Sequence, residues 1–80
     1  MRLDKYLKVS RLIKRRTTAN EACDAGRVTI NGKAAKASAQ VKKGDVIEIA
    51  FGNRTVKVRV QEIEETVRKE NAESLYEYIP

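Results

Sequence analysis

The stretch that decides how this chain folds is MRLDKYLKVSRLIKRR, residues 1–16. It carries seven basic residues against one acid, Asp4, and it contains no Gly or Pro. This composition favours a helix over the whole stretch. Most of its larger apolar side chains fall on one arc of a helical wheel, and three cations fall on the other side. The apolar arc holds Leu3, Tyr6, Leu7, Val9 and Ile13, and the basic side holds Lys8, Arg11 and Arg15.

Two features of this predicted helix need an explanation. Leu12 falls off the apolar arc, so either a second element covers it or the helix bends before it. The basic side is either the solvated face of an ordinary amphipathic helix or a face that binds phosphate. Asp4 is interpreted as a brace for neighbouring Arg or Lys side chains rather than as a general acid.

Charge is distributed unevenly along the 80 residues, whose formal net charge is +6. Residues 1–43 hold twelve Lys or Arg against three acids, a net charge of +9. Residues 44–80 hold five against eight acids, a net charge of −3. This asymmetry indicates one face for a polyanionic partner and a neutral or mildly acidic back.

The residue types in the sequence limit the metal sites and catalytic groups that the protein can have. Cys23 is the only cysteine and histidine is absent, so the sequence has no set of Cys and His ligands for zinc and no histidine for catalysis. We expect a non-enzymatic protein without metal or cofactor, and Cys23 as a small buried apolar residue rather than a reactive thiol. No apolar run has transmembrane length and the N-terminus has no signal-peptide core, so we expect a cytoplasmic protein with no membrane partner.

A second, short helix follows the basic stretch. Thr18 and Glu21 form a capping box that predicts its start, and Gly26 predicts its end. Small residues at 19, 22 and 23 share one face, which allows close packing on the first helix. Residues 14–16 then lie near the N-terminus of the second helix, where free amide donors favour an anion. Alternatively, the stems of these cations only cover the junction.

Strand patterns fill the middle of the chain. Residues 27–30 and 33–36 flank Asn31-Gly32, a strong hairpin signal, and Gly44-Asp45 marks a turn. Residues 46–51 and 54–60 predict a second hairpin, in which Val56, Val58 and Val60 point inward. In the acidic tail, residues 71–79 predict a short helix capped by Asn71 that packs Leu75, Tyr78 and Ile79 on the sheet.

Taken in chain order, these predicted helices, turns and strands resemble the S4 RNA-binding domain over about residues 2–51. The resemblance implies an α+β fold in which two N-terminal helices pack on a small, mostly antiparallel sheet. It also implies a single S4-type domain over residues 1–80, with an added hairpin strand and tail in residues 52–80. The matching positions are Arg2-Leu3-Asp4-Lys5-Tyr6-Leu7, Arg11, Arg15-Arg16, Ala19, Gly26-Arg27-Val28, Ile30-Asn31-Gly32, Lys36 and Val41 with Gly44-Asp45-Val46-Ile47.

Among stand-alone S4 proteins, the chain resembles the bacterial ribosome quality-control factors of the RqcP group through residues 2–5, residues 7–17 and its short C-terminal tail. That resemblance implies a monomer that binds 23S rRNA and peptidyl-tRNA on stalled large (50S) subunits, while an RqcH-type factor adds C-terminal alanine tails. The related heat-shock S4 proteins, which have a longer basic extension, imply instead a recycling factor for 50S subunits carrying peptidyl-tRNA. A DNA-binding architectural module and a protein-interaction module that uses the acidic side are further alternatives.

The predicted RNA-binding residues combine the positions carried over from S4 domains with the neighbouring cations. No aromatic residues are arranged for base stacking, because Tyr6 and Phe51 fall on apolar faces, so we expect structured RNA as the ligand. The predicted residues are Arg2, Asp4, Lys5, Lys8, Arg11, Lys14, Arg15, Arg16, Arg27 and Lys36.

Overall fold

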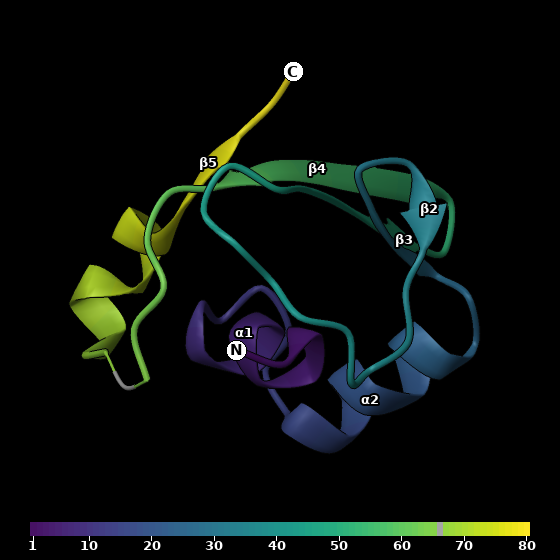
Figure 1. The fold of residues 1–80 in the computed structure, drawn as a ribbon, viewed down its shortest axis with the longest axis horizontal. Coiled ribbons are helices and arrows are strands. Elements are labelled where there is room, and N and C mark those ends of the chain that lie inside the picture. Colours follow the sequence, from purple (N-terminus) through teal and green to yellow (C-terminus); the bar gives the residue numbers. More distant parts are fainter. Residues whose placement is uncertain (66) are drawn as a thin grey trace.

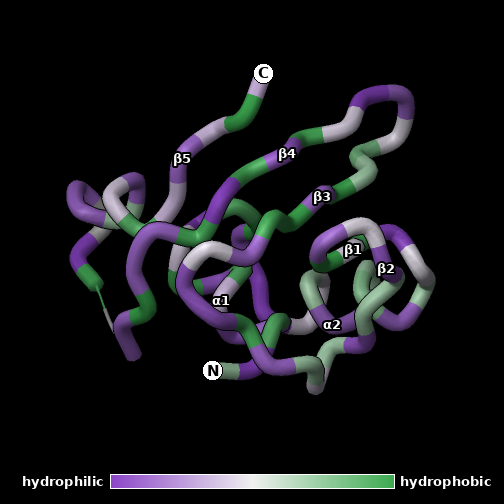
Figure 2. The backbone as a smooth tube through the Cα atoms, turned by 45° about the horizontal axis from the view of Figure 1, so that its top comes forward, coloured by the Kyte–Doolittle hydropathy of each residue, from purple (hydrophilic) through white to green (hydrophobic). Residues whose placement is uncertain are grey.

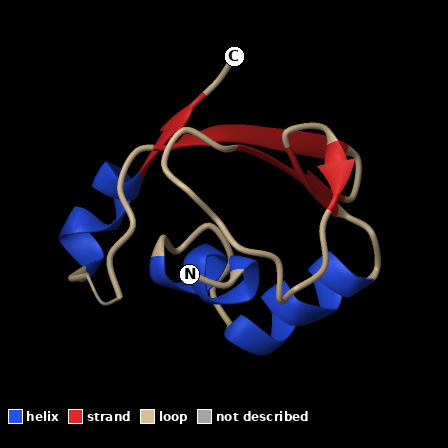
Figure 3. Ribbon diagram, viewed as in Figure 1, coloured by secondary structure: helices blue, strands red, loops and turns tan. Residues whose placement is uncertain are grey.

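Two N-terminal helices cover one face of an antiparallel sheet (Figure 1 and Figure 3). The computed structural model describes residues 1–65 and 67–80. Its sheet has the strand order β2-β1-β3-β4-β5, and every neighbouring pair is antiparallel. The expected α+β arrangement is therefore confirmed. The elements are α1 (Leu3–Val9), α2 (Arg16–Asp24), β1 (Val28–Ile30), β2 (Lys33–Ala34), β3 (Val46–Phe51), β4 (Arg54–Val60), the 3-10 helix η1 (Lys69–Leu75) and β5 (Tyr76–Tyr78).

Helix α1 is shorter than predicted. It ends at Val9 instead of continuing to the junction at residues 14–16, because Arg11 takes a left-handed conformation with φ +63°. The Ser10 hydroxyl donates to the Leu7 carbonyl over 3.2 Å, and the Ile13 N–H donates to the same carbonyl over 3.1 Å. This turn returns Ile13 to the core, so the bend before Leu12 explains why that residue fell off the apolar arc.

Helix α2 begins at Arg16, after an extended Arg15 that makes no side-chain cap. The predicted capping box is wrong, because Thr18 already lies inside the helix. The predicted stop at Gly26 is confirmed: its φ is +80° and its N–H donates to the Cys23 carbonyl. Cys23 is buried as expected, and burial raises the pKa of its thiol to about 11, as do the nearby carboxylates of Asp4 and Asp24.

The strands follow the predicted pattern closely. Asn31 and Gly32 have φ of +52° and +85°, which confirms the first hairpin, although β2 is only two residues long. Strands β3 and β4 have the predicted bounds. Figure 2 shows hydrophobic and hydrophilic residues alternating along β4, where Val58 and Val60 are buried, Val56 is half-buried, and Lys57 and Arg59 are exposed.

The tail differs from its prediction. Residues 71–79 do not form one helix capped by Asn71, because η1 ends at Leu75 and the chain continues as β5, which pairs with β4. Leu75 is buried as expected, whereas Tyr78 is 63% exposed. The Tyr6 hydroxyl of α1 donates to the Leu75 carbonyl over 2.7 Å in the interior. The tail therefore adds an edge strand and is tied to the first helix.

A connector, residues 35–45, links the first hairpin to β3 and runs beside the N-terminus (Figure 1). The backbone N–H groups of Leu3 and Asp4 donate to the Ala39 and Ala37 carbonyls, and that of Val41 donates to the Met1 carbonyl. These bonds hold the backbone at the start of α1, including Arg2, against the connector. In the described part of the chain, no helix is both long enough and apolar enough to span a membrane.

Candidate RNA-binding site

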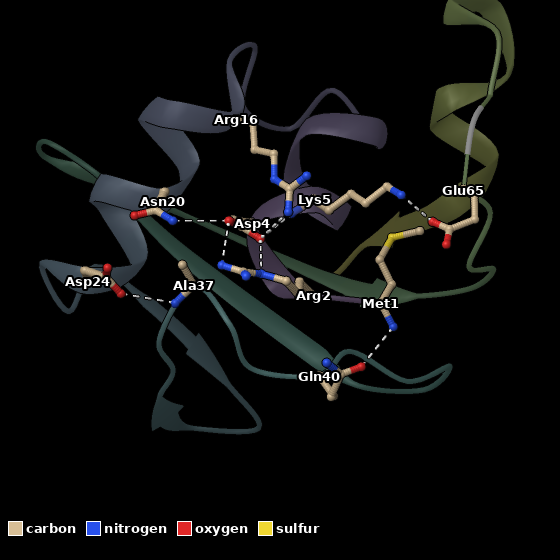
Figure 4. A network of polar contacts seen from close by, with 10 residues as sticks. All are labelled: Met1, Arg2, Asp4, Lys5, Arg16, Asn20, Asp24, Ala37, Gln40 and Glu65. Atoms are coloured by element: carbon tan, nitrogen blue, oxygen red, sulfur yellow. Dashed lines mark hydrogen bonds and ion pairs between the residues drawn. The ribbon is translucent and has the colours of Figure 1, made fainter.

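The site is centred on Asp4, a nearly buried carboxylate in the first turn of α1 (Figure 4). Arg2 donates to it through Nε over 3.2 Å and through Nη2 over 3.3 Å. Arg16 donates from α2 through Nη2 over 3.5 Å, and the Asn20 amide donates over 3.2 Å. The Lys5 backbone N–H adds a 2.8 Å bond. A buried charge is stable only when it is compensated in this way.

The surroundings of Asp4 keep it ionised. Its burial opposes ionisation, but hydrogen bonds from Asn20, Arg16 and Arg2 outweigh that effect and hold the pKa of the carboxyl below its ordinary value. The Asp4 side chain is only 2% exposed, whereas those of Arg2 and Arg16 remain 46% and 47% exposed. Asp4 therefore orients two guanidinium groups from separate elements while part of each stays accessible, which confirms the predicted brace.

A second group of cations lies directly beside this network. Lys5 and Lys8 of α1, Arg11 of the turn and Arg16 of α2 line one hollow of about 470 Å³, here named the basic hollow. Arg16 belongs to both the hollow and the Asp4 network, so the two features form one continuous surface. The left-handed Arg11 brings about this convergence, since it turns the chain towards α2.

Two residues of the tail that line the basic hollow were not predicted from the sequence. Glu65 and Val67 of the tail also line it, and Glu65 Oε2 lies 2.7 Å from Lys5 Nζ. The hydrogen bond from Lys5 and its positive charge lower the pKa of the Glu65 carboxyl. The acidic composition of the tail was the available signal, but it did not indicate which carboxylate meets the cations.

The remaining predicted residues are arranged differently. Lys14 and Arg15 are exposed in the segment that leads into α2, as expected for the helix junction. Arg27 lines a separate hollow with Thr18 and Glu21, and Lys36 lines another beside the C-terminal end of α2. The structure therefore brings Arg2 and Arg16 together on Asp4, and it joins Lys5, Lys8 and Arg11 to them through Arg16 in the basic hollow. It does not bring Arg27 and Lys36 into that hollow.

Comparisons with known proteins agree with this architecture. Residues 1–47, more than half of the chain, match the family model described as the S4 domain. The chain belongs to the S4 domain family. The solved structure of heat shock protein 15 from Vibrio cholerae is similar with a TM-score of 0.92 and 31% identity, covering 99% of this chain and 81% of that one.

Curated relatives within the family are more similar in sequence. The RQC P-site tRNA stabilizing factor of Halalkalibacterium halodurans is 60% identical over 77 residues, which cover 96% of this chain and 88% of that protein. The factor of the same name in Bacillus subtilis is 57% identical, over 95% of this chain and 88% of its own length. The expected resemblance to the quality-control group of S4 proteins is therefore confirmed.

Proposed function

We propose that this protein is a non-enzymatic RNA-binding factor that acts on stalled large ribosomal subunits in bacteria and stabilises the tRNA there. The observation that carries the proposal is the surface formed by Arg2, Arg16 and the basic hollow around the Asp4 brace. Cations that are fixed by the fold recognise the backbone phosphates and shape of folded RNA. The names of the similar S4 proteins identify P-site tRNA as the ligand of those relatives.

The finer parts of the proposal concern partners. The protein contacts 23S rRNA of the 50S subunit and holds peptidyl-tRNA in place, acting as a monomer in the bacterial cytoplasm. In this position it supports an RqcH-type factor that extends the nascent chain with alanine. Lys14 and Arg15 flank Arg16 at the start of α2, and they add long-range attraction for the same RNA. Arg27 lines a hollow along α2 and Lys36 lines one at its C-terminal end, and both contact RNA at the margin of the surface.

Structured RNA fits this surface better than single strands do. Tyr6 is fully buried, and its hydroxyl bonds to the Leu75 carbonyl, so its ring is not available to stack on a base. Phe51 is half-buried, with the Arg54 guanidinium 5.9 Å from its ring centre. Recognition therefore depends on the cations that bond to Asp4 and line the basic hollow, and these read phosphate positions rather than base sequence.

Co-sedimentation with separated ribosomal subunits tests the function. We expect the protein to pellet with large subunits in preference to small ones, and more strongly when the large subunits carry peptidyl-tRNA. Arg16→Ala should weaken the binding about tenfold, because a charge-assisted contact to phosphate contributes on the order of 1–2 kcal/mol. Arg54→Ala, which removes an exposed arginine from the β3–β4 hairpin, is the matched control.

Three outcomes would contradict the proposal. One is equal binding to both subunits, and another is tighter binding to duplex DNA than to large subunits. The third is equal loss of binding in Arg16→Ala and Arg54→Ala. If a pull-down with this protein still captured its protein partners after nuclease treatment, a protein-interaction module would be favoured instead.

The second candidate is a recycling factor, which the TM-score of 0.92 to heat shock protein 15 favours. The two roles differ in what happens to the tRNA. A stabilising factor lengthens the time that peptidyl-tRNA stays on isolated large subunits, whereas a recycling factor shortens it. Release of labelled peptidyl-tRNA, measured with and without the protein, separates these two candidates.

A further inference from the structure

The basic hollow contains a carboxylate in contact with one of its cations. Among the described residues that line the hollow, Glu65 is the one acid beside Lys5, Lys8, Arg11 and Arg16. Its Oε2 lies 2.7 Å from Lys5 Nζ. Figure 4 shows the Lys5 side chain extending away from the Asp4 network towards Glu65. The Lys5 ammonium is therefore paired with the Glu65 carboxylate, whereas the guanidinium groups of Arg2 and Arg16 bond to Asp4.

The fold itself brings Glu65 to this place. Ile63 and Val67, on either side of it in the chain, are half-buried and pack against the core. The N–H groups of Gln61 and Glu62 donate to the Leu75 carbonyl over 2.8 and 3.2 Å. The backbone near Glu65 is thus anchored by packing and by hydrogen bonds that do not involve Lys5.

The Lys5–Glu65 ion pair is nevertheless easy to exchange. The Glu65 side chain is 75% exposed and that of Lys5 is 35% exposed, and ion pairs this accessible to water contribute little net stability. A phosphate oxygen can accept the same charge-assisted bond from the lysine ammonium. The three other cations of the hollow would then surround the incoming group.

We propose that the Glu65 carboxylate occupies a phosphate position of the basic hollow, and that an RNA phosphate replaces it at Lys5 when RNA binds. The inference rests on the proposed function for the source of the phosphate. Glu65 is then an intramolecular competitor that lowers the affinity for every polyanion. It also reduces the net number of ions released on binding, since the displaced carboxylate regains a counterion.

Inorganic tripolyphosphate is a suitable first probe, because it requires no ribosome. Its binding is followed by the amide chemical shifts of Lys5, Lys8 and Arg11 in the wild-type protein and in Glu65→Gln. We expect Glu65→Gln to bind two- to fivefold more tightly. The matched control is Glu64→Gln, which removes one negative charge from the neighbouring exposed residue and should stay near the wild-type affinity.

A double-mutant cycle tests whether Lys5 is the shared partner. In a Lys5→Met background, the gain from Glu65→Gln should fall to less than half of its value in the wild-type background. Equal affinity of the wild type and Glu65→Gln, an equal gain in Glu64→Gln or absence of tripolyphosphate binding would overturn the proposal. Weaker binding by Glu65→Gln would also overturn it, because Glu65 would then be orienting Lys5 for the ligand.

Repeating the measurement with large ribosomal subunits separates this inference from the proposed function. Competition predicts that Glu65→Gln binds the subunits two- to fivefold more tightly at low salt and with a steeper salt dependence than the wild type. If tripolyphosphate gives the expected order and the subunits do not bind, the proposed function fails and the phosphate position stands. If the subunits bind and Glu65→Gln matches Glu64→Gln with both ligands, the competitor role fails and the function stands.

Discussion

At the scale of single residues, Asp4 links stability to recognition. A carboxylate that is 2% exposed would be unfavourable alone, yet it remains ionised because Arg2, Arg16 and Asn20 donate to it. The same bonds hold two guanidinium groups in fixed positions. Loss of the charge at Asp4 should therefore affect both folding and RNA binding, whereas loss of one arginine should affect mainly binding.

Asp4→Asn tests this link, because asparagine keeps the shape of the side chain and loses its charge. We expect the free energy of unfolding at pH 7 to fall by about 1–3 kcal/mol, since hydrogen bonds to a charged group are lost. Because the folded-state pKa of Asp4 lies below its unfolded value of about 3.9, this stability is present above about pH 4. It disappears as the pH falls through the folded-state value.

Urea denaturation at pH 7, 5 and 3 is the measurement. The difference between the wild-type protein and Asp4→Asn should be largest at pH 7 and should shrink at pH 3. Glu64→Gln, at an exposed residue of the tail, is a control for removing a carboxylate and should lose less stability. A difference between the wild type and Asp4→Asn that is independent of pH would contradict an ionised brace.

At the scale of elements, turn chemistry sets the geometry of the first hairpin. Asn31 has φ +52°, its Oδ1 accepts from the Val46 N–H over 2.9 Å and its Nδ2 donates to Asp45 over 3.1 Å. Asparagine thus supplies a left-handed conformation and two side-chain bonds that connect the β1–β2 turn to the start of β3.

Two substitutions at Asn31 separate these contributions. Asn31→Ala should lower the free energy of unfolding by about 2 kcal/mol, from left-handed strain and lost hydrogen bonds together. Asn31→Gly removes the strain and keeps only the hydrogen-bond loss, so it should cost about 1 kcal/mol. Thermal or urea denaturation compares the variants. Equal costs would show that backbone conformation contributes nothing at this turn.

Elements with a strong local signal could be predicted from the sequence, and elements defined by distant contacts could not. Strict alternation predicted the bounds of β4, because its two faces meet different environments. The end of α1 was missed, because apolar periodicity continues past Val9 while the left-handed Arg11 stops the helix. Strand β5 was missed because Tyr76–Tyr78 is defined by pairing with β4, residues that are distant in sequence.

For the candidate site, the sequence predicted which residues contribute but not how they are grouped in space. Charge counting identified the cations, and the resemblance to S4 domains selected Arg2, Lys5, Arg15 and Arg16 among them and added Asp4. Neither of these predicted that Glu65 enters the basic hollow or that Arg27 and Lys36 lie outside it. Those facts depend on how the tail and the connector pack, and no local sequence pattern contains that information.

At the scale of the whole molecule, the tail stabilises the helix that carries the site. The Tyr6 hydroxyl donates to the Leu75 carbonyl over 2.7 Å, a bond between residues 69 positions apart in sequence. Burial of the Tyr6 ring raises the pKa of its hydroxyl, which therefore stays protonated and able to donate. The N-terminal binding surface and the acidic C-terminal part are thus joined through the interior.

Tyr6→Phe measures the strength of this connection. We expect it to lower the free energy of unfolding by about 0.5–1.5 kcal/mol, because one buried hydrogen bond is lost while the Leu75 carbonyl keeps its other donors. Tyr78→Phe removes a hydroxyl from an exposed side chain and should change stability by less than about 0.5 kcal/mol. Urea denaturation of both variants provides the comparison, and equal effects would argue against the connection.

The most direct test of a single basic RNA-binding surface is the salt dependence of affinity for large ribosomal subunits. If about six phosphates are neutralised together, a plot of log affinity against log salt should have a slope of roughly −4 to −5. Arg16→Ala should make the slope less steep by about one, and Arg54→Ala should leave it unchanged. A slope near zero, or the same change in both variants, would contradict the convergence of these cations into one RNA-binding surface.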